Sequence, residues 1–281
     1  MVLHRAILYG EGLLRKNGVP EPRWNAERLL LLTLNQERSK IYSDLNRELT
    51  SLELQQYEAL LRKRADHYPL AYLEGTQEFY GRQFFVGPGV LIPRPETEEI
   101  VRAILELALP ESVRILDLGS GSGCIAVTLA LELPSSAVYA LDISMDALRV
   151  LRRNARERVH IARGDLFTIP FIPERFDVVV ANPPYVEASS FRELPAETKW
   201  EPYIALASNS LEETYRCLIR QSMRVLKPGG FLGFEIGYGQ ADRIRRISER
   251  EKEAQLVQIR NDRQSIPRTF VLQKVHCVSQ K

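Results

Sequence analysis

A valine-rich run ends abruptly in a short motif that could bind a substrate. The run VVVA is followed by the motif Asn182, Pro183, Pro184 and Tyr185, called NPPY below. Two prolines donate no backbone hydrogen bonds, so they end a strand and stiffen the chain that follows. The Asn182 side-chain oxygen and the Pro183 carbonyl can accept both N–H bonds of a planar NH2 group, which can stack on Tyr185. The motif therefore predicts a rigid turn that grips an amide or aromatic amine, without distinguishing adenine, cytosine and glutamine.

A second candidate site is the glycine-rich stretch DLGSGSGC, which joins an expected strand to an expected helix. Glycines let the backbone turn tightly and let a ligand approach the main chain closely. The dinucleotide fingerprint G-x-G-x-x-G needs a glycine at position 124, where this chain has Cys124. The pattern predicts a nucleoside-containing cofactor without naming it. The residues expected to bind that cofactor here are Asp117, Gly119, Ser120, Gly121, Ser122 and Gly123.

Acidic residues follow the next two expected strands. Asp142 ends the second strand and can hydrogen-bond a ribose diol, either in NAD or in an adenosyl sulfonium. Asp165 ends the third strand and could reach an adenine amino group. Ile143 and Leu166, which follow these acids directly, are expected to bind the same cofactor. Because the carboxyl ends of parallel strands form one edge of a sheet, the cofactor and NPPY should lie side by side.

The glycine loop and these acids resemble those of class I S-adenosylmethionine-dependent methyltransferases. The resemblance implies that the three strand ends hold the methionine part, the ribose and the adenine of S-adenosyl-L-methionine, with S-adenosyl-L-homocysteine as product. In-line methyl transfer needs a nucleophile held about 3–3.5 Å from the methyl carbon. Two acceptors in NPPY would orient the N–H bonds so that the nitrogen lone pair faces the methyl group. The methylated nitrogen can release its proton afterwards, so no general base is expected.

Longer motifs resemble a narrower family. They are PLAYLEGTQEFYGRQFFVGPGVLIPRPETEEIV, LDLGSGSGCIA, VVANPPYV, WEPYIAL and LKPGGFLGFEIGYGQ. They look like the protein-(glutamine-N5) methyltransferases of the HemK/PrmC family, by motif over about residues 70–275. The resemblance implies methylation of the side-chain amide nitrogen (N5) of the glutamine in the Gly-Gly-Gln motif of peptide chain release factors, which modulates translation termination. It also implies that an N-terminal helical domain helps to hold the release factor.

Other substrates and a non-enzymatic role stay open at this point. A sister enzyme methylates a glutamine of a ribosomal protein, but residues 93–98, PRPETE, resemble the release factor branch. The resemblance places Arg94 near the cofactor or the site entrance and Glu201–Pro202 on its wall, and it leaves the role of Glu235 open. An adenine-N6 nucleic-acid methyltransferase would flip a base into an equivalent pocket, and it usually needs a basic reading region. The complete set of motifs argues against a binding module without turnover.

Composition excludes several classes of protein. The 281 residues are 44% hydrophobic and 26% charged with a net charge of +2, which is typical of a globular protein. Acids and bases are interspersed, so no direct nucleic-acid partner is expected. Cys124, Cys217 and Cys277 are spaced for neither disulfides nor zinc, and no metal is expected. No apolar run resembles a signal peptide or membrane span, so we expect a cytoplasmic protein. The family resemblance implies a release factor as partner, and we expect a monomer.

The order of sequence patterns predicts three regions. Residues 1–75 carry apolar residues at helical spacing and predict an N-terminal helical domain. The family resemblance implies that this domain docks the substrate. Residues 76–95, with aromatics around glycines and then Pro-Arg-Pro, predict a β-hairpin and an extended linker. Residues 96–281 alternate strands and helices, which predicts a doubly wound α/β sheet. The family resemblance implies that this is a Rossmann-like methyltransferase domain with a seven-stranded sheet.

Overall fold

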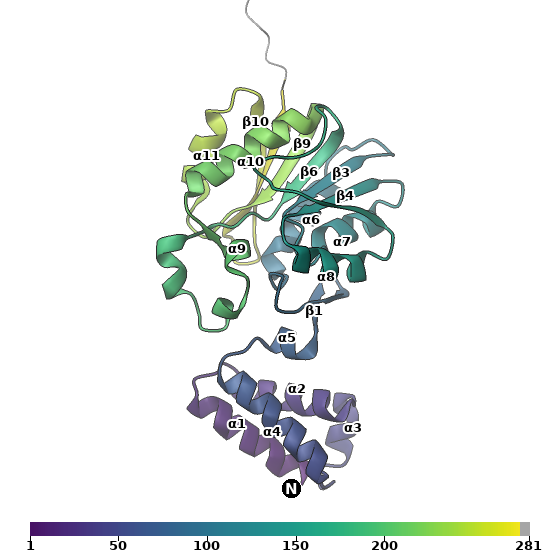
Figure 1. Cartoon of the computed structure of the whole chain (residues 1–281), viewed down its shortest axis with the longest axis vertical. Helices are drawn as coiled ribbons and strands as arrows, with labels where there is room; N and C mark the ends of the chain where they lie inside the picture. The colour runs from purple at the N-terminus through teal and green to yellow at the C-terminus, as the bar shows by residue number, and fades with distance from the viewer. Residues whose placement is uncertain (276–281) are drawn as a thin grey trace, which may run out of the picture. The chain divides into compact units, whose positions relative to one another are not determined.

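The computed structural model describes residues 1–275, so Cys277 lies outside the described residues. The chain divides into two compact units. The first contains residues 1–75 and 195–200, and the second contains residues 76–194 and the chain from residue 201 onward. Figure 1 shows the first unit as a group of helices and the second as a sheet with helices on its faces.

The first unit is helical, which confirms the predicted N-terminal helical region. Its helices are α1 (Leu3–Lys16), α2 (Pro22–Leu34), α3 (Arg38–Ser43), α4 (Ser51–Ala65) and α5 (Leu70–Glu74). Helix α4 begins with a capping box, in which the Thr50 hydroxyl and the Glu53 carboxylate each accept the other residue's backbone N–H. The leucine-rich core closes on Tyr57, whose hydroxyl donates to the Ala26 carbonyl at 3.1 Å.

Residues 195–200 belong to this helical unit although they come late in the chain. Arg64 of α4 is buried and pairs with Glu197 at 2.7 Å. The Trp200 indole packs edge-on against Tyr68, with ring centroids 5.1 Å apart. Sequence reading gave no sign of these contacts, because the partners are separated by more than a hundred positions.

The second unit begins with the hairpin expected before the linker. Strands β1 (Thr76–Phe79) and β2 (Arg82–Phe85) pair antiparallel across a two-residue turn. The turn residues Tyr80 and Gly81 have φ values of 52° and 69°, which is the type I′ geometry that matches strand twist.

The seven-stranded sheet predicted from the sequence is present. Its strands are β3 (Arg114–Leu118), β4 (Ala137–Asp142), β5 (Val159–Arg163), β6 (Phe176–Ala181), β9 (Leu226–Glu235), β10 (Ala254–Asn261) and β11 (Pro267–Lys274). The strand order is β10-β11-β9-β6-β3-β4-β5. Strands β9, β6, β3, β4 and β5 run parallel, whereas β11 is antiparallel to both of its neighbours.

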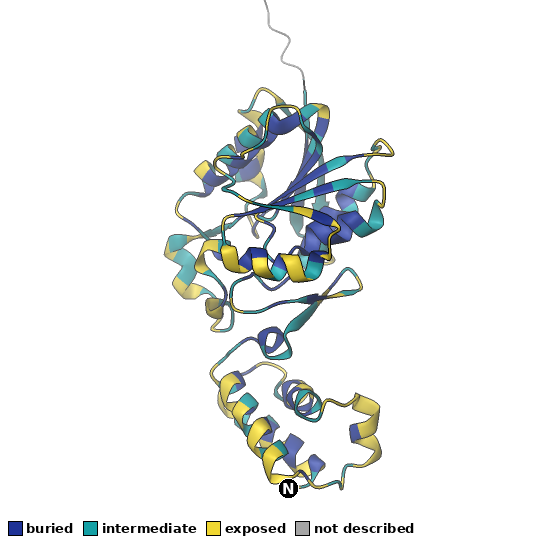
Figure 2. Cartoon of the chain, turned by 45° about the vertical axis from the view of Figure 1, so that its right-hand side comes forward, coloured by how far each residue is buried: buried dark blue, intermediate teal, exposed yellow. Residues whose placement is uncertain are grey.

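Helices cover both faces of the sheet, so the central strands are buried on both sides. Helices α6 (Glu98–Leu105), α7 (Cys124–Glu132) and α8 (Met145–Ala155) pack on one face, and α10 (Leu211–Val225) and α11 (Ala241–Glu249) pack on the other. Val178 and Val180 join the first core and Val179 joins the second, because side chains alternate along a strand. Figure 2 shows the central strands as buried and the outer helix faces as exposed. This two-sided burial explains the uninterrupted valine run.

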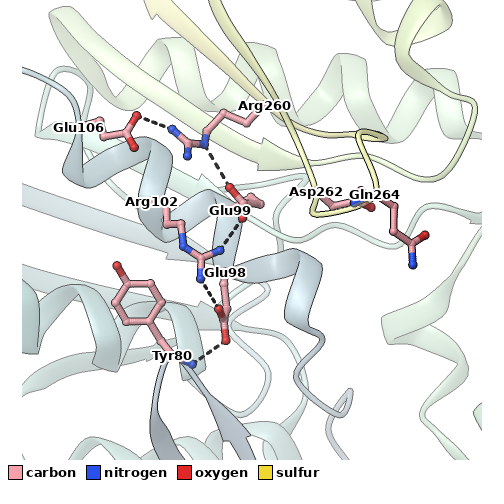
Figure 3. Close-up of polar contacts among 8 residues, drawn as sticks. All are labelled: Tyr80, Glu98, Glu99, Arg102, Glu106, Arg260, Asp262 and Gln264. Carbon is pink, nitrogen blue, oxygen red and sulfur yellow. Dashed lines mark hydrogen bonds and ion pairs between the residues drawn. The ribbon is translucent and has the colours of Figure 1, made fainter.

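Helix α6 is tied to two other elements by charged side chains (Figure 3). Arg102 pairs with Glu98 at 2.6 Å and with Glu99, and Glu99 also pairs with Arg260 of β10 at 3.2 Å. Glu98 in turn accepts the backbone N–H of Tyr80 in the hairpin turn at 2.9 Å. The start of α6 is thereby fixed against both the hairpin and the sheet.

Several elements and one boundary differ from the sequence expectation. The unpredicted elements are α11 and the short segments η1 (Pro95–Thr97), β7 (Val186–Glu187), η2 (Ala188–Glu193), η3 (Thr198–Trp200), α9 (Tyr203–Leu206) and β8 (Ala207–Ser208). Strand β5 ends at Arg163, so Asp165 lies two residues past the strand and not at its end. Within residues 1–275, no helix combines the length and apolarity needed to cross a membrane.

Candidate active site

The two candidate motifs meet where the order of the parallel strands reverses. The glycine loop follows β3 and NPPY follows β6, and these strands are neighbours. From β3 the chain continues outward to β4 and β5, whereas β6 leads to β9 on the other side. Such a switch point leaves a crevice outside the carboxyl ends of the strands.

A cavity of about 390 Å³ lies at this crevice. Most of the residues singled out from the sequence line it. They are Arg94, Gly119, Ser120, Gly121, Ser122, Asp142, Ile143, Asp165, Leu166, Asn182, Pro183 and Pro184. Asp117, Gly123 and Tyr185 are not among the lining residues. The volume falls in the range that holds a small molecule or cofactor.

Two glycines of the loop have different tasks. Gly119 has φ 67° and no atom within 4 Å of the place where a Cβ would stand, so its backbone is open to close approach. Gly123 has φ 81°, and a Cβ there would lie 2.1 Å from the Leu151 Cδ1 atom of α8. The first position leaves room for a ligand, and the second lets α8 pack against the loop.

Asp142 holds the glycine loop in place. Its Oδ2 accepts the Gly121 N–H at 2.8 Å, and its Oδ1 accepts the Ser144 N–H at 2.8 Å. Burial raises the pKa of Asp142 above its ordinary value, and these two N–H groups act against that shift. Each carboxylate oxygen keeps a second lone pair, so the carboxylate can still accept from a ribose diol.

Asp117 is buried beneath the loop and does not line the cavity. Its Oδ2 accepts the Ala126 N–H of α7 at 3.2 Å, and its Oδ1 has no hydrogen-bond partner among residues 1–275. Burial raises the pKa of Asp117 to about 7. Direct cofactor binding by Asp117 therefore stays a prediction, while its contact with the start of α7 is a feature of the fold.

The loop after β5 forms another wall of the cavity. The Asp165 carboxylate accepts the Phe167 N–H at 2.9 Å, which folds the chain so that Leu166 and Phe167 both line the cavity. Ile143 lines it from the end of β4 and is 41% exposed. A polar acid flanked by large apolar side chains suits a flat, partly polar group such as a nucleobase.

In NPPY, the asparagine amide is fixed on one side only. Asn182 Nδ2 donates to the Thr97 hydroxyl at 3.1 Å. Asn182 Oδ1 is buried and accepts no hydrogen bond from any residue in the described range 1–275. A buried acceptor without a partner costs free energy, so this atom is suited to a donor that arrives with a ligand.

Tyr185 contacts the protein core and Glu235. Its ring packs into the core beneath α10 and α11, and its backbone carbonyl accepts from Gln240 Nε2 at 2.8 Å. Its hydroxyl interacts with the Glu235 carboxyl, and burial raises the pKa of Tyr185 well above its ordinary value. The predicted stacking on Tyr185 stays untested by this geometry.

Arg94 belongs to an arm that is fastened beside the cavity. Its guanidinium pairs with Glu201, and the other Glu201 oxygen accepts the Ile92 N–H at 2.9 Å. Pro202 and Ile204, which follow Glu201, line the cavity. The Arg94–Glu201 pair therefore joins two stretches that form one wall.

Comparisons with known proteins identify the family of this chain. The family model for the PrmC N-terminal domain matches residues 5–75, and that for the methyltransferase small domain matches residues 100–214. The release factor glutamine methyltransferase of Koribacter versatilis is 40% identical over 262 residues, covering 91% of this chain and 92% of the relative. The chain belongs to the release factor glutamine methyltransferase family.

Other members of the family support the same assignment. The release factor glutamine methyltransferase of Moorella thermoacetica is 40% identical over 88% of this chain and 90% of its own length. The one from Chlorobaculum tepidum is 39% identical over 82% of this chain and 83% of its own length. Both matches extend over most of each protein, so the relationship is not confined to the cofactor-binding sheet.

Sequence reasoning missed several residues that line the cavity. Thr97 was not singled out, although it contacts Asn182 directly and lines the cavity. Ile204 and Ser208 also line the cavity, from short elements that have no sequence signature. Glu235 was noted without a role, and the structure places its carboxylate 2.6 Å from the Thr97 hydroxyl.

Proposed function

We propose that this protein transfers a methyl group from S-adenosyl-L-methionine to the side-chain amide nitrogen of the glutamine in the Gly-Gly-Gln motif of a peptide chain release factor. Family membership at about 40% identity over most of the chain supports the release factor as substrate. The observation that carries the proposal is the Asn182 amide beside the cavity, with Oδ1 buried and without a partner among residues 1–275.

The residues around the cavity fit the cofactor. Gly119 leaves open space where a side chain would stand, and Asp142 holds the loop while keeping lone pairs for a ribose diol. Asp165 and Leu166 lie where the adenine is proposed to bind. When bound, S-adenosyl-L-methionine supplies an electrophilic methyl carbon on a positively charged sulfur.

The chain's own residues would prepare the glutamine amide. An amide nitrogen is a weak nucleophile because its lone pair is delocalised into the carbonyl. If Asn182 Oδ1 and the Pro183 carbonyl accept its two N–H bonds, the amide is held in one orientation and the lone pair can face the methyl carbon. As the N–C bond forms, the C–S bond breaks and the sulfur keeps the electron pair. The nitrogen then loses one of its protons to solvent, so the product is a neutral N-methyl amide.

The proposal is tested by offering several acceptors together. The protein is incubated with radiolabelled S-adenosyl-L-methionine, purified release factor, ribosomal protein and plasmid DNA, and the label in each is counted. We expect label in the release factor alone. As a matched control, a release factor whose Gly-Gly-Gln glutamine is replaced by glutamate should take up none, because it lacks the NH2 group. Label in the ribosomal protein or in DNA, with none in the release factor, would refute the proposal.

A further inference from the structure

Three side chains form a continuous hydrogen-bonded line beside NPPY. Asn182 Nδ2 donates to Thr97 Oγ1 at 3.1 Å, and Thr97 Oγ1 donates to Glu235 Oε2 at 2.6 Å. Asn182 follows β6, Thr97 ends η1 just before α6, and Glu235 ends β9. Because Ala181 of β6 pairs with Phe234 of β9, the next residues along, Asn182 and Glu235, are held at the same level of the sheet.

Thr97 stands in a position where its hydroxyl would ordinarily cap a helix. It is the residue before α6, yet its side chain makes no capping hydrogen bond. A threonine there usually accepts a backbone N–H from the first turn of the helix. Here Thr97 is 2% exposed, and its hydroxyl bonds the side chains of Asn182 and Glu235. The Thr97 hydroxyl therefore links the Asn182 and Glu235 side chains and does not cap helix α6.

The direction of each bond in this line follows from donor and acceptor counts. A hydroxyl has one proton, and an ionised carboxylate can only accept. Glu235 therefore takes the Thr97 proton, which leaves the Thr97 oxygen as an acceptor. Only the NH2 group of the Asn182 amide can donate a hydrogen bond to the Thr97 oxygen. The amide oxygen, Oδ1, must therefore face away from Thr97.

We infer that Thr97 and Glu235 are positioning residues that lock the Asn182 amide with its oxygen presented to the substrate N–H. This inference rests on the proposed function, because it assigns the free Oδ1 to the glutamine amide. Without this contact to Thr97, the Asn182 amide can rotate about its terminal torsion, so that its NH2 group faces the NH2 group of the substrate glutamine. Such an orientation pairs two donors and cannot hold the substrate amide.

The protonation state of Glu235 would set the direction of the line. The pKa of Glu235 is raised to about 7, and burial is the largest cause. The charge of Glu96 also raises this pKa, whereas the hydrogen bonds with Thr97 and Tyr185 and the charge of Arg268 lower it. Other polar groups near Glu235 are the Tyr215 hydroxyl, which donates to the Glu235 backbone carbonyl, the Cys124 thiol, and Thr269, which pairs with Glu235 across the sheet. A protonated Glu235 can donate to Thr97, which frees the Thr97 proton to bond Asn182 Oδ1. Acid pH should therefore release the lock.

The test compares Thr97→Val with Thr97→Ser in the full-length protein, with release factor and S-adenosyl-L-methionine as substrates. Valine keeps the shape of threonine but removes the hydroxyl, so we expect kcat to fall on the order of ten- to hundredfold, the effect of losing one or two hydrogen bonds in the transition state. Cofactor affinity, measured by calorimetry, should stay within about twofold, because Thr97 is not proposed to touch the cofactor. Serine restores the hydroxyl and should restore most of kcat.

A matched control is available in α7. Thr128 is also fully buried, and its hydroxyl has no hydrogen-bond partner among residues 1–275. Thr128→Val makes the same chemical change in the same unit, so it reports the cost of the substitution itself. Its kcat should match wild type. Thermal melting of all three variants shows whether any of them is unfolded at the assay temperature.

A pH profile provides the second measurement. Wild-type kcat should fall as pH is lowered through about 7, and Glu235→Gln, which has no carboxyl group to protonate there, should have a lower kcat and lack that decline. Asp117 has a pKa in the same range as Glu235. If kcat of Glu235→Gln still falls at acid pH as it does in wild type, another group causes the decline and the inference is overturned.

The outcomes separate the two proposals. If wild type methylates the release factor and Thr97→Val does so with unchanged kcat, the positioning role is wrong while the proposed function stands. If Thr97→Ser loses as much activity as Thr97→Val, packing and not the hydroxyl matters, and the positioning role is again wrong. If wild type does not methylate the release factor at all, both proposals fail.

Discussion

Replacing Asp142 with asparagine tests how the glycine loop and the cofactor are held together. Both Asp142 oxygens accept backbone N–H groups at 2.8 Å, one from Gly121 and one from Ser144. Asparagine has the same shape, but only its side-chain oxygen, and not its NH2 group, can accept a hydrogen bond. Its NH2 group would therefore face one of these N–H donors.

The magnitude follows from this mismatch. The variant loses one charge-assisted hydrogen bond and leaves a backbone donor unpaired, which costs about 1.5–3 kcal/mol. That cost falls on the free and the cofactor-bound protein alike. The charge-assisted hydrogen bond that Asp142 is proposed to make to the cofactor ribose exists only in the complex, so its loss should weaken binding by about 1.5–3 kcal/mol. The dissociation constant for S-adenosyl-L-methionine should then rise about ten- to hundredfold.

Isothermal calorimetry of Asp142→Asn against wild type measures the effect. Asp177→Asn is the matched control, because Asp177 also accepts two donors, Arg114 N at 2.8 Å and Lys227 Nζ at 2.7 Å. It lies near the amino end of β6, away from the cavity, so its variant should bind the cofactor within about twofold of wild type. Equal affinities for Asp142→Asn and wild type would refute the assignment of Asp142 to the cofactor site.

Two further predictions concern stability. Gly123→Ala should lower the free energy of unfolding by about 2–5 kcal/mol, because it combines a positive φ with a clash against Leu151. Gly229→Ala, at φ 78° in open space, should lower it by only about 1–2 kcal/mol. Urea denaturation measures both variants, and equal losses would contradict the packing argument. Asp117 has a pKa of about 7 in the folded protein against 3.8 for the free side chain, so the folded state binds the extra proton and stability should decrease as pH rises through that interval. Asp117→Asn keeps an acceptor for Ala126 N, and the free energy of unfolding of this variant, measured by denaturation at several pH values, should decrease less steeply with pH than that of wild type. An identical dependence on pH would exclude Asp117 as the source of the decrease.

The sequence predicted the features that depend on local pattern. Alternation of strands and helices indicated a parallel sheet, and the rule that ligands bind beyond the carboxyl ends of strands brought the glycine loop and NPPY together. The fold prediction was confirmed because chain geometry is readable from consecutive residues. The asparagine in NPPY is expected to offer its side-chain oxygen to the substrate, and this role stays a prediction, although Asn182 Oδ1 has no partner among residues 1–275.

What the sequence could not predict depends on contacts between distant residues. Thr97 and Glu235 are 138 positions apart, so no local pattern joins them. The cavity wall around Ile204 is built from a four-residue helix and two-residue strands, which exist only through tertiary packing. Helix α11 was missed because Ile244 and Ile247 are its only buried apolar residues in a stretch dominated by charge. Tyr185 packs, partly buried, against the core beneath α10 and α11, a contact that the local motif does not reveal, and its stacking role stays a prediction.

Peptide mass spectrometry of the release factor, after incubation with S-adenosyl-L-methionine and either wild type or Asn182→Ala, tests the central claim most directly. The account predicts one added methyl group on the side chain of the Gly-Gly-Gln glutamine with wild type. It predicts none with Asn182→Ala, although calorimetry should show that this variant still binds the cofactor. An unmodified glutamine with the wild-type protein, or methylation by Asn182→Ala at a rate near wild type, would contradict it.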